Sequence, residues 1–189
     1  MYALVRSPIC PLMSRPSSQC ELADEVLHGM TVEVLEEALP GWYRVRAPYR
    51  YEGYAPEAGL LFGEGHAARW ASLPKRVVVK SFCDVLSGPA VTCFPLEALT
   101  RGALVSPVGS PDANGWQRVE LSDSREGYTK CSFLSEYHAT PRFEREEDMR
   151  RAVTETARTY LGTHYRWGGK TPMGIDCSGL VSMSYLLNG

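Results

Sequence analysis

A cysteine near the end of the chain stands in a setting that favours a reactive thiolate. Cys177 lies within Asp-Cys-Ser-Gly, directly after a glycine-rich stretch, and apolar residues at helical spacing follow it. The pattern predicts a helix that begins at Cys177, where unpaired backbone N–H groups and the helix dipole favour a thiolate over a thiol. The thiolate is the nucleophile, so Cys177 is a candidate catalytic residue. The alternative is a small buried hydrophobic residue at a helix start.

A second motif lies just before the cysteine. Tyr165-Arg-Trp-Gly-Gly169 precedes Asp176-Cys-Ser-Gly-Leu-Val181. Together the two motifs, within about the last 45 residues, resemble the NlpC-type peptidases, a bacterial cell-wall branch of the papain-like fold. The resemblance implies a cysteine endopeptidase that hydrolyses the bond between D-glutamate and a diamino acid in peptidoglycan stem peptides.

The same resemblance implies roles for the residues of both motifs. Cys177 is the nucleophile, and Tyr165 holds its hydroxyl near the reacting centre or is a packed aromatic residue of the loop. Asp176 either caps the helix or faces the substrate and holds a free N-terminal amine. The backbone N–H of Cys177 or of Ser178 is available to an oxyanion. The implied substrate-binding residues are Asp176, Ser178, Trp167 and Gly168, with Gly169 beside them in the cleft wall.

The histidines depart from the family pattern. The family's general base is a histidine well downstream of the cysteine, on the central sheet, and papain-type activation needs this Cys–His pair. The four histidines here, at 28, 66, 138 and 164, all precede Cys177, and the chain ends at Gly189. We therefore expect an incomplete catalytic domain, which lacks its sheet and its base and is inactive alone. The missing C-terminal part of that domain is a possible partner.

Composition excludes several classes of function. With 44% hydrophobic and 22% charged residues the chain is an ordinary globular protein. A net charge of -2 provides no electrostatic basis for binding nucleic acid or an anionic membrane. No apolar run approaches the roughly 18–20 residues that span a bilayer. None of the six cysteines has the C-x-x-C spacing of a zinc site, so we expect neither a metal nor a cofactor.

The cysteine spacing exposes an internal repeat. Cys10 and Cys20 recur as Cys83 and Cys93, an offset of 73 residues. One inserted residue then makes the offset 74, at a turn that tolerates insertion. The other matching residues are Gly29 and Gly102, Gly41-Trp42 and Gly115-Trp116, Val45 and Val119, and Glu52-Gly53-Tyr54 and Glu126-Gly127-Tyr128.

Each repeat is predicted to be a small β-barrel. Short alternating runs such as 31–35, 42–46 and 116–120 are separated by turn residues. This pattern resembles the bacterial SH3-like domains that commonly precede NlpC-type catalytic domains. We expect a mainly β chain with two tandem SH3-like barrels, at 1–62 and 75–135, followed at 142–189 by the N-terminal helical part of an α+β papain-like domain. The apolar stripe of 146–160 predicts its first helix, with Gly162 as C′ residue.

Two features of the barrels keep more than one interpretation. The repeated aromatic residues form a ligand-binding patch or the barrel cores, and core is favoured because aromatic side chains bury large areas. The cysteines of each repeat face each other across a loop as thiols or as disulfides. The segment from Gly63 to Pro74 is expected to be a linker. The aromatic residues in question are Trp42, Trp116, Tyr54 and Tyr128.

The barrels also suggest which substrates reach the cleft. A barrel packed over a papain-like cleft closes its non-primed side, so that only a short peptide with a free amine fits, such as L-Ala-γ-D-Glu-diamino acid. Polar side chains near Tyr51 and the 52–54 turn are then expected to approach Asp176 and Tyr165. The N-terminus lacks a signal-peptide pattern, and Cys177 must stay reduced. Both points favour a cytoplasmic enzyme of murein peptide recycling.

Other hypotheses remain. The barrels could anchor a secreted hydrolase to the cell wall. A chain that truly ends at Gly189 would be a catalytically dead module that binds peptide or wall. The same Cys–His chemistry also serves acyl transfer in related folds. A histidine in a strand downstream of residue 189 would separate the peptidase from the binding module.

Overall fold

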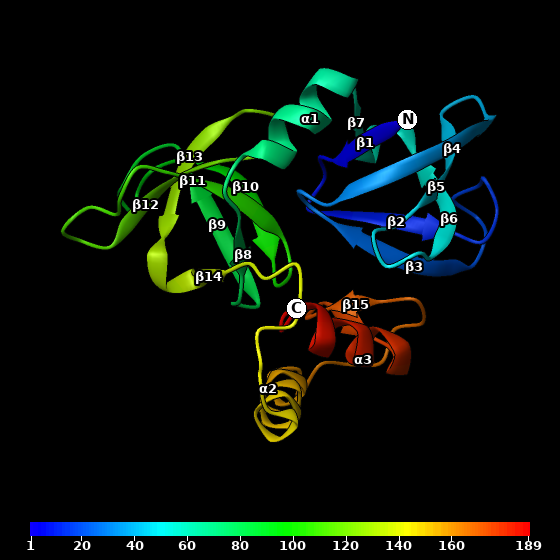
Figure 1. Ribbon diagram of the computed structural model, residues 1–189. Helices are drawn as coiled ribbons and strands as arrows, with labels where there is room; N and C mark the ends of the chain where they lie inside the picture. The colour runs from blue at the N-terminus through cyan, green and yellow to red at the C-terminus, as the bar shows by residue number, and fades with distance from the viewer.

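A computed structural model of the chain describes residues 1–189, the side chain of Glu64 excepted. Two β-barrels lie side by side with two helices beneath them (Figure 1). The first barrel contains β1 (Tyr2–Val5), β2 (Ile9–Met13), β3 (Leu22–Leu27), β4 (Thr31–Leu39), β5 (Trp42–Arg46), β6 (Glu52–Pro56), the 3-10 helix η1 (Glu57–Gly59) and β7 (Leu60–Phe62). The second contains β8 (Arg76–Val78), β9 (Phe82–Leu86), β10 (Pro95–Thr100), β11 (Leu104–Val108), β12 (Trp116–Glu120), β13 (Glu126–Lys130), η2 (Cys131–Phe133) and β14 (Leu134–Glu136).

The two barrels have the same topology. The strand order is β3-β2-β6-β5-β4-β1-β7 in the first and β10-β9-β13-β12-β11-β8-β14 in the second, so each strand has a counterpart. The register agrees too, because Trp42 pairs with Pro56 and Trp116 pairs with Lys130. The repeat in the sequence is therefore a repeat in the structure, and the mainly β class is confirmed. We keep 1–62, 75–135 and 142–189 as the proposed domain limits.

The barrel cores are aliphatic, which corrects the expectation of aromatic cores. None of the four repeated aromatic residues belongs to either core cluster, whereas Val45 and Val119 are fully buried in them. Side chains alternate between the two faces of a strand, so a tryptophan three residues before an inward-pointing valine lies on the opposite face. Trp116 is buried there beneath the Lys130 ammonium, 4.1 Å from the ring centre.

The segment between the barrels is a helix rather than a plain linker. Helix α1 (Glu64–Ser72) carries Ala67 and Trp70 at i, i+3 spacing, and both side chains are buried against the barrels. The indole N–H of Trp70 donates a hydrogen bond of 2.8 Å to Gly29 O of the first barrel. The helix thus fixes the two barrels relative to each other.

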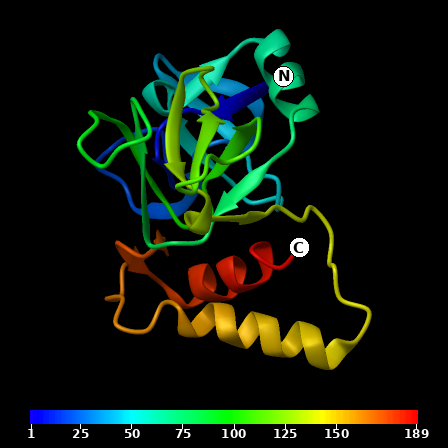
Figure 2. The same ribbon diagram turned by 90° about the vertical axis from the view of Figure 1, so that its left-hand side faces the viewer.

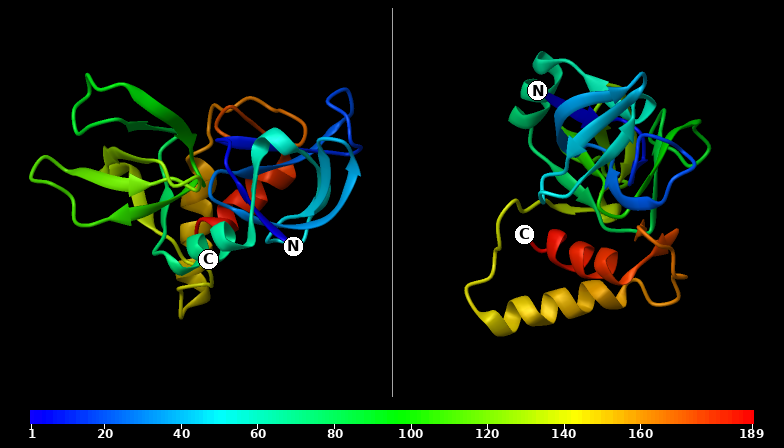
Figure 3. Two further views of the ribbon diagram at one scale, coloured as in Figure 1. Left: turned by 90° about the horizontal axis from the view of Figure 1, so that it is seen from above. Right: turned by 90° about the vertical axis from the view of Figure 1, so that its right-hand side faces the viewer.

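The helical part begins with α2 (Glu146–Arg158), whose first residue is the predicted one. The chain then turns through Gly162, which has the positive φ of +86° expected there. A two-stranded hairpin, β15 (Lys170–Thr171) and β16 (Gly174–Ile175), leads into α3 (Cys177–Leu186). Helix α3 lies between α2 and the barrels (Figure 2), beneath the junction of the two barrels when viewed from above (Figure 3).

The three parts meet around the side chain of Met183. This residue of α3 is fully buried in the same apolar cluster as Val26 and Leu27 of the first barrel. Gly102 of the second barrel lies against both, since a Cβ there would be 2.5 Å from Met183 Cε and 2.7 Å from Leu27 Cδ1. The helical part therefore completes its core with residues of the barrels.

All six cysteines are free thiols, so neither repeat contains the possible disulfide. Cys10 and Cys83 occupy equivalent positions in β2 and β9 and are fully buried. Burial raises the pKa of Cys10 to about 12 and that of Cys83 to about 11. Both are core residues. No helix in the described part of the chain is long and apolar enough to cross a membrane.

Candidate active site

Helix α3 begins at Cys177, and Asp176 is its N-cap. Asp176 Oδ1 accepts hydrogen bonds from the backbone N–H of Gly179 and from the Ser178 hydroxyl, each of 2.7 Å. Its Oδ2 accepts a third bond, of 2.8 Å, from the backbone N–H of Gly168. Burial alone would raise the pKa of Asp176, but these hydrogen bonds outweigh it and lower that pKa. The carboxylate therefore caps the helix and ties it to the Trp-Gly-Gly loop.

Cys177 occupies the exposed side of the first turn of α3. Val181 and Tyr185 follow it at i+4 and i+8 and are 58% and 50% exposed, so they share its face. The apolar residues of α3 therefore lie on two faces of the helix. Leu180 and Leu186 pack on the barrel, whereas Val181 and Tyr185 face outward. Within the described residues no hydrogen bond reaches Cys177 Sγ, and none of the four histidines donates to or accepts from it.

The loop of the first motif is held against the strand that leads to the cysteine. Tyr165 forms a parallel bridge with Ile175, and Asp176 N–H donates to Gly169 O at 3.0 Å. Gly168 has φ +68°, and a Cβ there would lie only 2.5 Å from Leu22 O of the first barrel, so glycine is required. The side chains of Tyr165 and Trp167 are more than half exposed. The structure thus joins Gly168, Asp176 and Ser178 directly and holds the motif tyrosine and tryptophan at the surface.

The first barrel contributes a buried ionic cluster that sequence reasoning missed. Asp24 and Glu25 of β3, together with Tyr49, meet Arg166 and Lys170 of the loop. Lys170 Nζ lies 2.7 Å from Asp24 Oδ1 and donates to Tyr49 OH at 2.8 Å, while Tyr49 donates to Asp24 Oδ2 at 2.7 Å. Glu25 accepts from Arg166 Nη2 and from the backbone N–H of Lys170.

The charges of this cluster are strongly perturbed. Burial lowers the pKa of Lys170 and raises the pKa of Glu25, in each case against the effect of the opposite charges beside it. Burial also raises the pKa of Tyr49, beside Asp24. A sign of the cluster was present in the sequence, because two consecutive acids in a short β run must place one acid on each face.

A cavity of about 150 Å³ lies where this cluster meets α3. Tyr51 of the first barrel and Ser178 of α3 both line it, so the barrel and the cysteine helix each contribute to its walls. Burial raises the pKa of Tyr51, and the carboxylates of Asp24, Glu21 and Asp176 raise it further. The full lining is Ala23, Asp24, Tyr49, Tyr51, Lys170, Ser178, Gly179 and Ser182.

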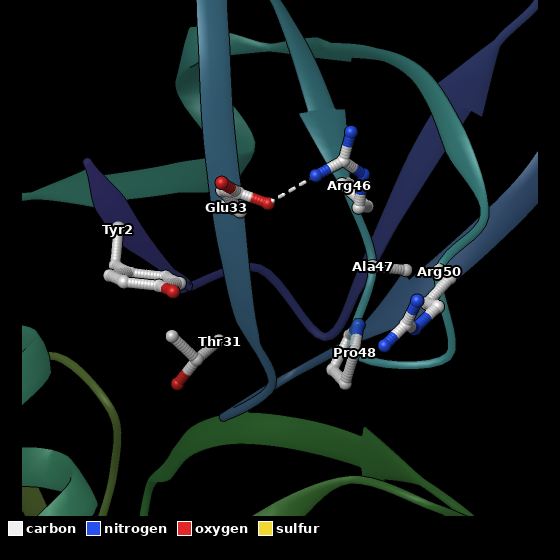
Figure 4. A pocket seen from close by; sticks show the side chains of 7 residues that line it. All are labelled: Tyr2, Thr31, Glu33, Arg46, Ala47, Pro48 and Arg50. Carbon is white, nitrogen blue, oxygen red and sulfur yellow. Dashed lines mark hydrogen bonds and ion pairs between the residues drawn. The ribbon is translucent and has the colours of Figure 1, made fainter.

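A larger cavity, of about 580 Å³, contains none of the predicted site residues (Figure 4). It lies on the first barrel, where Arg46 donates a hydrogen bond of 2.7 Å to Glu33. Arg46 and Glu33 are thus paired with each other, and because the smaller cavity is lined by Ser178, which follows Cys177 in the chain, we place the candidate site there. Among the described residues no group of three or more histidine, cysteine or acidic side chains is arranged to hold a metal ion.

Comparison with known proteins places these features in context. Residues 12–60 match the model of the bacterial dipeptidyl-peptidase Sh3 domain, and residues 162–189 match the NlpC/P60 family. The chain is 39% identical over its full length to "Dipeptidyl-peptidase 6" of Lysinibacillus sphaericus, of which it spans 70%. A further match, 50% identical over 36 residues, covers 19% of the chain and 9% of "Probable endopeptidase Rv2190c" of Mycobacterium tuberculosis.

Two solved structures show the same fold. An NlpC/P60 family protein from Bacillus cereus superposes with a TM-score of 0.80 at 18% identity, over the whole of this chain and 72% of that one. An NlpC/P60 endopeptidase from Photobacterium damselae superposes with a TM-score of 0.62 at 13% identity, over 98% of this chain and 43% of that one. The arrangement of barrels and helices is thus shared with solved structures.

Proposed function

The chain belongs to the NlpC/P60 family of peptidases, and we propose that it is the larger part of a cysteine endopeptidase whose nucleophile is Cys177. The proposed substrate is a peptidoglycan stem peptide, cleaved between γ-D-glutamate and the diamino acid. The observation that carries the proposal is that the first barrel and the cysteine helix together form the walls of one small cavity, with Asp24, Lys170 and Ser178 among its lining residues.

The proposed reaction is attack of the Cys177 thiolate on the amide carbonyl carbon. The carbonyl oxygen becomes an oxyanion in the tetrahedral intermediate and requires hydrogen-bond donors. Within the described residues the backbone N–H of Cys177 donates to no acceptor, whereas that of Gly179 is already bound to Asp176. The Cys177 N–H is therefore the donor that we assign to the oxyanion, with Tyr165 beside it.

The proposed reaction also needs a general base to deprotonate the Cys177 thiol. No histidine of the described chain is hydrogen-bonded to Cys177, so we propose that the base lies outside residues 1–189. By the same reasoning the 189-residue chain alone should not turn over substrate. The outward side chains of Val181 and Tyr185 are proposed to pack against the part of the domain that carries this base.

The cavity supports a substrate that begins with a free amine. The carboxylates of Asp24, Glu21 and Asp176 each act to raise the pKa of Tyr51. Asp24 is already paired with Lys170, but the charges of Glu21 and Asp176 still suit an ammonium group. The cavity volume of about 150 Å³ suits a small residue such as the N-terminal L-alanine of L-Ala-γ-D-Glu-diamino acid. The proposed substrate-binding residues are Asp176, Ser178, Trp167 and Gly168.

A cavity that binds a free N-terminal amine, here called the closed amine site, favours a role in recycling murein peptides. An intact wall polymer carries its alanine in an amide linkage and has no ammonium to bind. We therefore propose a cytoplasmic enzyme that acts on free peptides. The buried contact of Met183 with the first barrel supports this choice over a secreted hydrolase in which the barrels swing freely as anchors.

The test measures the rates at which the enzyme that includes its catalytic histidine cleaves three substrates. We expect rapid cleavage of L-Ala-γ-D-Glu-diamino acid, a steep loss for the N-acetylated tripeptide, and no release of peptide from intact sacculi. Cys177→Ala should abolish all cleavage and serves as the blank. Equal rates on the three substrates would contradict the closed amine site and favour the secreted hydrolase. Turnover by the 189-residue chain alone would contradict the assignment of the base.

A further inference from the structure

Glu25 connects the first barrel to the loop of the active site at two points. Its Oε1 accepts a hydrogen bond from Arg166 Nη2, and its Oε2 accepts one of 2.9 Å from the backbone N–H of Lys170. These two residues flank Trp167, Gly168 and Gly169. The Glu25 side chain is 5% exposed. The carboxylate therefore holds both ends of the Trp-Gly-Gly loop.

The held loop connects directly to the start of the cysteine helix. The backbone N–H of Gly169 donates to Arg166 O at 3.0 Å, which closes the loop on itself. Asp176 N–H then donates to Gly169 O at 3.0 Å, and Gly168 N–H donates to Asp176 Oδ2. Only one peptide bond separates Asp176 from Cys177. A continuous hydrogen-bonded path therefore runs from Glu25 to the residue before the nucleophile.

The barrel itself does not require an acid at this position. At the repeat offset of 73, Glu25 corresponds to Ala98 of β10, which is exposed to solvent. The second barrel thus folds with the same strand order and an alanine there. Glu25 lies on the face of β3 that also carries Leu27, and that face packs on the helical part. The acid is therefore a feature of the contact with the loop.

We propose that Glu25 is a positioning residue, which acts through Arg166 and Lys170 to fix the Trp-Gly-Gly loop and hence the start of the Cys177 helix. This positioning role depends on the proposed function only where an effect on catalysis is expected. The first barrel is then part of the catalytic apparatus, although Glu25 does not itself line the cavity and acts through Lys170, which does. A displaced nucleophile loses rate steeply, because reaction depends on near-attack geometry.

Stability and positioning can be separated at this residue. Burial raises the pKa of Glu25, so the stability that it contributes is fully present below the usual carboxyl pKa and is lost as pH rises through the raised value. A substitution that removes the Glu25 carboxylate should speed amide exchange mainly in the loop, whereas loss of a residue that only stabilises the fold would speed exchange throughout the chain.

The experiment uses Glu25→Gln, Glu25→Ala and the control Glu97→Gln. Glutamine retains an acceptor for Lys170 N–H and loses the charge that binds Arg166, whereas alanine loses both contacts. Glu97 occupies β10 of the second barrel and holds Arg125 through an ion pair of 2.8 Å, with no contact to the loop. Amide hydrogen exchange and Tm are measured on the 189-residue chain, and kcat and KM are measured on the enzyme that includes its histidine.

For Glu25→Ala we expect amide exchange at Gly168 and Lys170 to accelerate at least about tenfold while β4 and β5 stay protected. In the enzyme we expect kcat to fall about 10- to 100-fold, with a smaller loss for Glu25→Gln and none for Glu97→Gln. Unchanged exchange at Gly168 and Lys170 would overturn the proposal. So would uniform acceleration across the chain with a lowered Tm. If the wild-type enzyme leaves the tripeptide intact, the proposed function fails, and exchange still decides the role of Glu25.

Discussion

His28 Nε2 accepts a hydrogen bond of 3.1 Å from the backbone N–H of Ser122, across the interface between the two barrels. A backbone N–H can only donate, so Nε2 carries no proton, and Nδ1 donates to Arg6 O at 2.8 Å. The fully buried imidazole is thus neutral and spans both barrels. The equivalent turn of the second barrel contains Arg101, which contacts the helical part instead by donating to Thr159 O at 3.1 Å. Each barrel therefore contacts the next part of the chain through the same turn.

Acid should weaken the chain through His28. Burial lowers its pKa, while Asp123 and Glu97 act to raise it and Arg125 to lower it. The unfolded state then binds more protons between the lowered pKa and the ordinary value of about 6.5. Stability is complete above that value and falls as pH decreases below it, by up to about 1.4 kcal/mol per pH unit. Urea unfolding between pH 5 and pH 8 measures the slope. His28→Gln keeps one donor and one acceptor, so its slope should be shallower by this amount, and an identical slope would contradict the assignment.

Gly168→Ala and Gly109→Ala form a matched pair of substitutions. The two glycines have φ of +68° and +66°, so alanine pays the same backbone cost of about 1 kcal/mol at each. A Cβ at Gly109 meets no atom within 4 Å, whereas at Gly168 it lies 2.5 Å from Leu22 O. Gly168→Ala should therefore lower the free energy of unfolding by clearly more than Gly109→Ala. Equal losses in chemical denaturation would show that the loop does not press on the barrel.

Met183→Ala should destabilise the whole chain. Its side chain is fully buried between α3 and the barrels, and removing a buried methionine side chain typically costs about 2–5 kcal/mol. Val181→Ala on the exposed side of the same helix should change stability by no more than about 0.5 kcal/mol. Thermal unfolding of the two variants compares these effects. A small loss for Met183→Ala would mean that the helices are not anchored on the barrel.

The cysteines should differ sharply in reactivity. Cys10 and Cys83 are buried, with pKa values raised to about 12 and about 11, so at pH 7 they contain almost no thiolate. Cys131 and Cys177 are exposed, and Cys177 alone begins an α-helix of more than one turn. Iodoacetamide at pH 7 should therefore label Cys177 first and Cys131 more slowly, as mass spectrometry of the digested chain would show. Faster labelling of Cys131 than of Cys177 would contradict the claim that the N-terminus of α3 makes Cys177 reactive.

Local patterns predicted much of this structure. The offset of 73 residues between Cys10 and Cys83 predicted two like barrels, and both residues lie in equivalent strands. The acidic start of α2 and the start of α3 at Cys177 were also predicted, because capping residues and apolar spacing are local signals.

Contacts between distant segments were beyond the reach of such patterns. Glu25 and Lys170 are 145 residues apart, and no spacing rule connects an acid in a barrel strand to a lysine in a glycine-rich loop. Trp70 was assigned to a linker although Ala67 and Trp70 have helical spacing, because the run around them is short. The interior or exterior position of Trp42 depended on which face of β5 packs inward, which the neighbouring Val45 could have indicated.

The burial of Met183 against Leu27 and Gly102 has a consequence for biosynthesis. Chains emerge from the ribosome N-terminus first and fold part by part, so both barrels are complete before α3 is available. The helix then settles on a surface that already exists, and it has no comparable apolar partner before that surface forms. The proposed nucleophile would thus reach its final place only after the barrel that is proposed to restrict its substrates has folded. The order of synthesis itself would then protect the cell from an unselective thiol peptidase.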